Sequence, residues 1–186
     1  IVSERYNRIE DVDVVSDASR LKEVIAEKDL TGKLNYIVSS HNFEHLPDPI
    51  SFLQGCSVGL VPGGVLAMAV PDGRACFDHF RMPTRLSDWL GAYHRGVTQP
   101  TPETIFDFRA NVSDYLAENG EMTSFSIERD TPDGFTPTRS LRAAYDAYLE
   151  AANAPGEYQD SHCSVFFGAS LELMLRDLKF LGVIDL

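Results

Sequence analysis

The sequence predicts an α/β fold in which a mostly parallel sheet carries helices on both faces and is interrupted by a helical insertion. Three short apolar runs, at residues 12–15, 36–39 and 65–70, alternate with amphipathic stretches. Nearly continuous apolar runs of this length are typical of strands buried on both faces. Helical links between such strands favour right-handed crossovers, which make neighbouring strands parallel.

The 186 residues, 44% of them hydrophobic, fit a single domain with a substantial core. We expect the α/β core to comprise residues 1–72 and 161–186. Residues 73–160 are richer in proline, threonine, aspartate and aromatic residues, and we interpret them as an insertion or cap.

The first half of the predicted core alternates strands and helices. Residues 12–15 form a β-branched run that ends at Ser16-Asp17, and residues 18–28 carry apolar side chains at helical spacing until Gly32. A second strand is predicted at residues 36–39. Asp48 and Pro49 then open a helix that ends before the Pro62-Gly63-Gly64 turn, and residues 65–70 are the third strand.

The later segments are mainly helical. The insertion shows helix-like patterns near residues 86–93, 103–117 and 140–152. Residues 170–181 carry an apolar stripe typical of a helix packed on a core, and residues 182–184 suggest the start of one more strand.

Charge and composition exclude several classes of protein. Sixteen basic and 28 acidic residues leave a net charge of −12, which argues against nucleic acid as a partner. No apolar run reaches the roughly 20 residues of a membrane-spanning helix, and the first residues lack a signal-peptide pattern. The three cysteines are widely spaced and form no CxxC, so we expect neither disulfides nor a cysteine zinc site, and a cytoplasmic location.

Three segments together resemble a known family. DVDVVSDASRL, YIVSSHNFEHLPDP and LVPGGVLAMAVPD are similar to the third, fourth and fifth strand segments of class I S-adenosylmethionine-dependent methyltransferases. The similarity is to the subgroup with an SSHxxEH turn and a PGGxL strand, and it covers roughly residues 10–75 well and 160–186 loosely. It implies a Rossmann-like sheet, S-adenosylmethionine as cofactor and a small-molecule or carbohydrate-like acceptor.

The resemblance also implies where the cofactor binds. Asp17 and Ala18 match the positions that contact adenine, and Ser39, Ser40 and His41 match those beside the methionine end. An open α/β sheet binds ligands at the carboxyl ends of its strands, where these residues are expected. Asp17 is equally suited to cap the following helix.

The sequence departs from the family at its strongest motif. The glycine-rich loop after the first strand is absent, as is the acidic residue after the second strand. We therefore expect a partial core that lacks the first strands and binds the cofactor poorly unless such a segment is supplied. The alternative is a non-catalytic methyltransferase-like module for binding or assembly, for instance beside a glycosyltransferase.

The segment HNFEH offers three potential metal ligands. His41, Glu44 and His45 lie at i, i+3 and i+4, on one face of a helix if the turn is helical. Some methyltransferases with a related E-x-x-E-H turn hold a divalent metal there with a distant histidine, a role that His162 matches. The same spacing occurs in inverzincin peptidases, but those need a sustained helix, whereas a strand precedes this segment and Pro47 follows it. The remaining interpretation is a buried polar pair of Glu44 and His45.

Methyl transfer to a hydroxyl also needs a group that accepts a proton. Histidine titrates near neutral pH, so His41, His45, His79 and His94 are the candidate general bases. We expect the insertion to determine the acceptor, because it supplies a mixture of aromatic and charged side chains.

Overall fold

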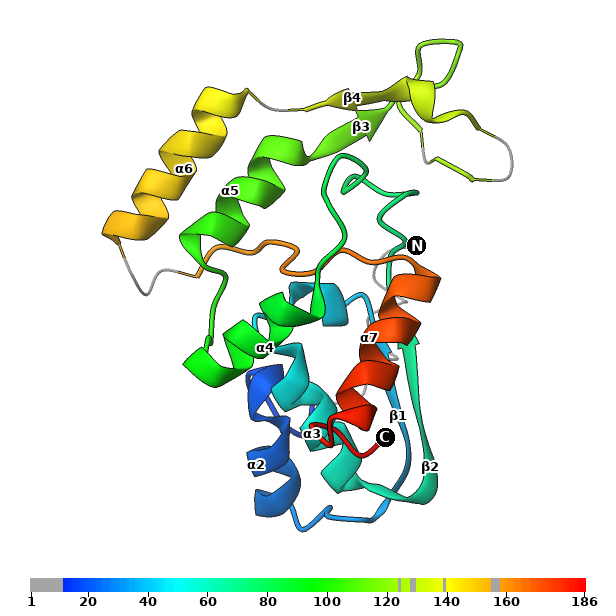
Figure 1. Ribbon diagram of the computed structural model, residues 1–186, viewed down its shortest axis with the longest axis vertical. Coiled ribbons are helices and arrows are strands. Elements are labelled where there is room, and N and C mark those ends of the chain that lie inside the picture. Colours follow the sequence, from blue (N-terminus) through cyan, green and yellow to red (C-terminus); the bar gives the residue numbers. More distant parts are fainter. Residues whose placement is uncertain (1–11, 124, 128–129, 139, 155–157) are drawn as a thin grey trace.

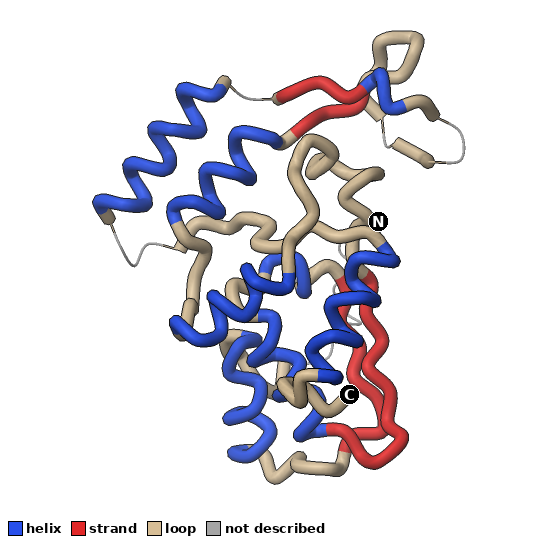
Figure 2. The backbone as a smooth tube through the Cα atoms, viewed as in Figure 1, coloured by secondary structure: helices blue, strands red, loops and turns tan. Residues whose placement is uncertain are grey.

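The computed structural model describes residues 12–123, 125–127, 130–138, 140–154 and 158–186 (Figure 1). Its lower half holds a parallel strand pair and four helices, and its upper half holds two helices and a short antiparallel ladder. Figure 2 shows that a long extended segment connects the two halves near the C-terminal helix. The chain is therefore an α/β protein with a small parallel sheet, as the sequence predicts.

The sheet consists of β1 (Leu34–Ser40) and β2 (Leu60–Ala69), joined by the helix α3 (Pro49–Gly59). The two strands are parallel, and their register runs from Tyr36 opposite Val65 to Ser40 opposite Ala69. Apolar and β-branched side chains favour the extended conformation in both. This β-α-β unit confirms the predicted crossover and brings both carboxyl ends to the same edge of the sheet.

The core fills one face of this sheet. Ile50, Leu53 and Cys56 lie on one side of α3 and are completely buried. Phe43 joins them to the helix α4 (Leu86–Arg95), because its ring meets the ring of Trp89 edge to face at 5.5 Å. Aromatic pairs of this geometry stabilise a core beyond the burial of their area.

Two further helices complete the core. The helix α2 (Leu21–Glu27) packs against α3, and α7 (Gly168–Phe180) contributes Met174 and Leu178. Asp48 caps the start of α3 by accepting a hydrogen bond from the amide of Ser51. Within the described ranges, no helix is long and apolar enough to cross a lipid bilayer.

Helices cover only one face of the sheet in the part of the chain that the structure describes. The opposite face exposes Tyr36 (71%), Val38 (70%) and Val65 (58%) to solvent. Figure 1 shows α3 and α7 on the same side of β1 and β2. The prediction of helices on both faces is therefore wrong for these residues, since strand composition alone does not reveal whether both faces are covered.

Two predicted strands are also absent from the described residues. Residues 12–15 form no ladder, and Val12 and Val15 are exposed, because no strand lies beside them within the described chain. Residues 183–184 likewise form no strand. The amide of Val183 donates a hydrogen bond to the carbonyl of Leu178 in the turn that ends α7. The side chain of Ile184 is buried in the core.

The insertion contains α5 (Pro102–Asn111), β3 (Ser113–Tyr115), β4 (Phe135–Pro137) and α6 (Leu141–Asn153). The helices α5 and α6 pack together, and β3 pairs with β4 in an antiparallel ladder. The helix predicted to reach residue 117 ends at Asn111. Tyr115 explains the change, because its ring packs on Phe125 and Phe135, each with centroids 5.0 Å away.

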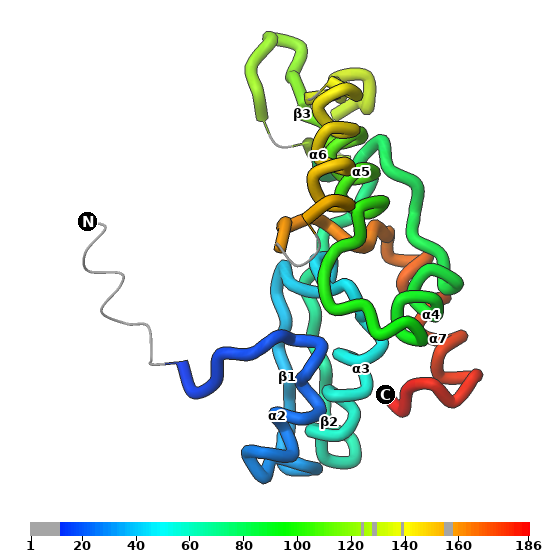
Figure 3. Tube along the Cα trace, turned by 90° about the vertical axis from the view of Figure 1, so that its left-hand side faces the viewer, coloured from blue at the N-terminus to red at the C-terminus, as the bar shows by residue number. Residues whose placement is uncertain are grey.

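The chain returns from the insertion to the core along residues 158–167, the orange segment in Figure 1. Hydrogen bonds fix this segment: the amide of Gly73 donates to Phe166, and Thr84 and Val165 exchange two bonds. Figure 3 shows the part of the insertion from α5 to α6 as a slender extension, whereas α4, which also belongs to residues 73–160, packs in the core through Trp89. The fixed return segment brings distant residues to the carboxyl edge of the sheet.

The close contact between α2 and α3 provides a test of the packing. A Cβ added at Gly55 would lie 2.8 Å from both the Cβ of Leu21 and the amide nitrogen of Lys22. We expect Gly55→Ala to lower the free energy of unfolding by about 1–3 kcal/mol despite alanine's higher helix propensity. Gly168→Ala, at the start of α7 with open space around the new methyl group, is the control and should change stability by less than about 0.5 kcal/mol. Equal urea midpoints for the two variants would contradict this packing.

Candidate functional site

The candidate site lies where β1 and β2 end. The amide of His41 donates to the carbonyl of Ala69 at 2.9 Å and continues the pairing one residue beyond β1. His41 has a left-handed backbone conformation (φ 48°), which turns the chain into the short 3-10 helix η2 (Phe43–His45). Asp72 follows β2 at the same edge, where its carboxylate pairs with Arg74.

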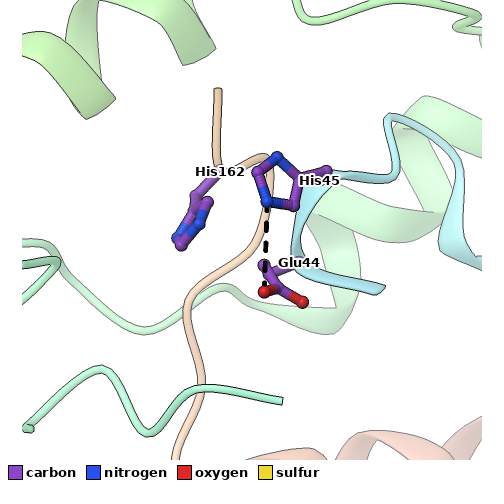
Figure 4. Close-up of side chains that lie close together, drawn as sticks. All are labelled: Glu44, His45 and His162. Atoms are coloured by element: carbon purple, nitrogen blue, oxygen red, sulfur yellow. Dashed lines mark ion pairs between the residues drawn. The ribbon is translucent and has the colours of Figure 1, made fainter. Parts of the chain in front are cut away.

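The return segment crosses this edge and binds η2. The carbonyl of Glu44 accepts hydrogen bonds from the amides of Cys163 (2.7 Å) and Ser164 (3.0 Å). These bonds bring His162 against His45, with ring centroids 4.6 Å apart and ring planes at 82°. Glu44, His45 and His162 form a cluster whose potential ligand atoms all lie within 4.8 Å of one another (Figure 4).

Each histidine of this cluster is held by an aspartate. His45 Nδ1 lies 2.9 Å from Asp160 Oδ1, and His162 Nδ1 lies 2.5 Å from Asp78 Oδ2. Asp78 also accepts a hydrogen bond from Arg81, whose Nε donates to Asp107. The two aspartates therefore fix the orientation of both imidazole rings.

The network around Asp78 is buried and charged. Burial by itself raises the pKa of the Asp78 carboxyl, but hydrogen bonds from His162 and the charge of Arg81 outweigh it and hold that pKa below its usual value. Phe77 and Phe108 lie against the His162 ring, with centroids 4.8 and 5.5 Å away. Burial raises the pKa of the neighbouring Cys163 thiol to about 12, so this thiol is protonated at neutral pH.

Two buried polar atoms at this edge lack a hydrogen-bond partner among the described residues. They are Glu44 Oε2 and Ser39 Oγ. The Glu44 side chain is 1% exposed, so a carboxylate oxygen without a partner there is costly. Buried polar groups that lack a partner among protein atoms mark places where a water molecule, an ion or another ligand binds, or where the group has a functional role.

The predicted cofactor residues occupy different environments. Asp17 is exposed and caps the 3-10 helix η1 (Ala18–Arg20): its Oδ1 accepts from both the amide and the hydroxyl of Ser19, each at 2.8 Å. Ser39 is buried and Ser40 is exposed at the end of β1. The capping role suggested by the sequence is confirmed for Asp17.

The four candidate bases are not gathered in one place. His45 belongs to the cluster, and His41 is 70% exposed with its Nδ1 3.5 Å from Glu44 Oε1. His79 lies in the insertion, where its ring stacks on Phe135 at 3.9 Å, and His94 is exposed near the end of α4. His41 stands outside η2, so HNFEH is not the continuous helix that an inverzincin peptidase requires.

Sequence reasoning missed the two aspartates that orient the histidines. Asp160 lies two residues before His162 in sequence, and this short separation is the signal that could have pointed to Asp160 as part of the site. Asp78 is 84 residues from His162 in sequence, and no spacing pattern links them. The structure brings them together because residues 72–84 run beside the return segment.

A cleft of about 760 Å³ lies between α4, α5 and the return segment, and Glu44, His45 and His162 are not among the residues that line it. Leu46 and Cys163, which line it, are the chain neighbours of His45 and His162. Its walls also carry several polar or charged side chains: Arg81, Arg85, Arg95, Gln99, Thr101, Thr104 and Asp107. The cleft is therefore suited to a polar small molecule.

No family model, curated protein or solved structure matches the chain in the comparisons with known proteins.

The buried charge network yields a stability test. Asp78→Asn removes the buried carboxylate that pairs with both Arg81 and His162 and leaves Arg81 with Asp107 alone, so we expect a loss of about 3–5 kcal/mol of unfolding free energy at pH 7. Because folding lowers the pKa of Asp78, the contribution of its charge is present above the unfolded value of about 3.9 and is lost as the pH falls through the folded pKa. The difference in unfolding free energy between wild type and Asp78→Asn should therefore become smaller in acid.

Asp146→Asn is the control, because it disrupts only the exposed pair with Arg142. It should lower the unfolding free energy by less than about 1 kcal/mol. Comparable losses in urea titrations of the two variants would refute the prediction.

Proposed function

We propose that the protein is an S-adenosylmethionine-dependent methyltransferase that acts on a small-molecule or carbohydrate-like acceptor. The observation that carries this proposal is the parallel pair of β1 and β2, whose carboxyl ends bring His41 and Asp72 to one edge. Open α/β sheets bind their ligands at that edge. The resemblance of the SSHxxEH and PGGxL segments supplies the identity of the cofactor.

The residues that would hold the cofactor fit the role. Asp17 Oδ1 is occupied by Ser19, and Oδ2 has no hydrogen-bond partner among the described residues. An aspartate oriented in this way can accept a hydrogen bond from the adenine amino group, with the amide of Ala18 beside it. The unpartnered Ser39 Oγ lies near the end of β1, where the methionine portion is expected.

The reaction transfers a methyl group from the sulfonium of the bound cofactor to an acceptor oxygen or nitrogen. The sulfur keeps the electron pair of the broken bond, and the acceptor releases a proton. Among the candidate bases, His45 has an imidazole that is held by a carboxylate, that of Asp160. We therefore propose His45 as the group that accepts the proton.

The cleft suggests the class of acceptor. Arginine, threonine and glutamine side chains in its walls can hydrogen-bond several hydroxyl groups at once. The net charge of −12 disfavours nucleic acid as the acceptor. A hydroxyl-rich small molecule is the substrate class that this lining supports best.

An assembly role is the alternative. The open face of the sheet, with Tyr36, Val38 and Val65 exposed, favours a non-catalytic methyltransferase-like module that contacts another protein, such as a glycosyltransferase. Binding of the cofactor product distinguishes the two proposals, because an assembly module has no need for it.

Calorimetric titration with S-adenosylhomocysteine is the test, carried out on the product of the complete gene. We expect binding to the wild type and roughly tenfold weaker binding to Asp17→Ala, since a hydrogen bond to a charged group contributes about 1.5–3 kcal/mol. Ser140→Ala removes the equivalent cap from α6, far from the edge of the sheet, and should leave the affinity unchanged. A wild-type protein that gives no binding heat with this ligand would reject the methyltransferase proposal in favour of assembly.

A further inference from the structure

The cluster of Glu44, His45 and His162 has the composition of a metal centre. We propose that it binds one divalent transition-metal ion through the Glu44 carboxylate and one nitrogen from each imidazole. This inference depends on the contacts of the cluster and stands or falls independently of methyl transfer.

The three side chains converge from segments far apart in sequence. Glu44 and His45 come from η2, and His162 comes from the return segment (Figure 4). His45 Nε2 faces Glu44 Oε1 at 4.0 Å, too far for a hydrogen bond. Two ligand atoms on a tetrahedral zinc ion, each at about 2.1 Å from it, lie about 3.4 Å apart, so the side chains must move closer by a fraction of an ångström to share an ion. Rotation about the last torsion of the Glu44 carboxylate is soft, which allows the remaining adjustment.

The aspartates prepare both rings for a ligand. When Nδ1–H donates to a carboxylate, the tautomer is fixed and Nε2 carries the free lone pair. Asp160 does this for His45 and Asp78 does it for His162. Within the described residues, neither Nε2 has a hydrogen-bond partner. Carboxylates that orient metal-binding histidines in this way are a recurring feature of metal centres, and their loss weakens binding about 10–100-fold.

The unpartnered oxygen of Glu44 is an independent indication of a ligand. Glu44 Oε2 is buried and makes no hydrogen bond with any described residue, while Oε1 has only His41 and His45 nearby, at 3.5 and 4.0 Å. A purely structural ion pair would place its donors within about 3 Å. A bound cation would satisfy both oxygens at once.

The ligand set indicates the class of ion. Two imidazoles and one carboxylate suit zinc, iron(II) or another first-row divalent ion, whereas calcium and magnesium prefer oxygen ligands throughout. Three protein ligands leave at least one position for water or for an acceptor hydroxyl. If the protein is a methyltransferase, such an ion would orient that hydroxyl and make it more acidic. The ion would then take over from His45 in promoting proton release, because metal binding at Nε2 occupies the free lone pair of that imidazole.

Two residues near the proposed ligands, His41 and Cys163, are not part of the ligand set. His41 Nδ1 lies 3.5 Å from Glu44 Oε1, but its side chain is 70% exposed and its nitrogens are not among the ligand atoms that lie close to both Glu44 and His162. Cys163 is adjacent to His162 in sequence, but its sulfur contacts the carbonyl of Ser161 and is not among the ligand atoms that come together in the cluster. We therefore exclude both from the proposed ligand set.

Titration with Co²⁺ tests the site, because its visible absorption reports the ligands and coordination of the ion. We expect saturation at one equivalent, with no thiolate charge-transfer band in the near ultraviolet. Glu44→Gln keeps the size of the side chain and removes its charge, and it should weaken binding at least tenfold. Asp160→Asn leaves all three ligands in place and should weaken binding about 10–100-fold.

His94→Ala is the matched control, since it removes an exposed histidine outside the cluster and should leave the affinity unchanged. Circular dichroism of each variant verifies that it folds. Failure of the wild type to bind Co²⁺, a thiolate band, or an equal loss in Glu44→Gln and His94→Ala would each overturn the proposal. S-adenosylhomocysteine binding is measured separately on the metal-free protein, so a negative result for the metal leaves the proposed function to its own test.

Discussion

The carbonyl of Glu44 is the point on which the organisation of this protein depends. By accepting two amides of the return segment, it fastens the chain that leaves the insertion to the turn that follows β1. The same contact closes the aromatic core, because Ser164 accepts a hydrogen bond from Trp89 and Phe166 packs against Phe43. Together with the hydrogen bond from His162 to Asp78, it fixes the position of His162 relative to His45.

The elements that local sequence determines were predicted well. The helices α3, α4, α6 and α7 and the strands β1 and β2 follow from apolar periodicity and capping residues, which act within a few residues. The turn predicted at Pro62-Gly63-Gly64 is different, because these residues lie within β2 and coincide with an irregularity in its register against β1. Residues 12–15 show the limit of this reasoning. Their β-branched composition favours a strand, but a strand needs a partner, and composition carries no information about one.

The site was predictable only in part for the same reason. The HNFEH segment predicted Glu44 and His45 as members of the site, and the family resemblance predicted His162. The same spacing also predicted His41. That residue has a left-handed backbone conformation and is not part of the cluster. Asp78 reaches His162 across 84 residues. Contacts of that kind arise from tertiary packing, so periodicity and motif spacing do not contain them. Two of the four predicted general bases, His79 and His94, are also not part of the cluster, although the sequence offers no reason to prefer His45 over them.

The bare face of the sheet has a consequence for how copies of this chain behave toward one another. A two-stranded ladder with an exposed apolar stripe attracts other copies at short range, while the charge of −12 keeps them apart at longer range. In salt of about 0.1 M that repulsion decays over roughly 10 Å, and in 1 M salt over about 3 Å. Salt therefore weakens the repulsion between copies and leaves the short-range attraction between their apolar stripes, so these copies should associate more readily in concentrated salt than in dilute buffer.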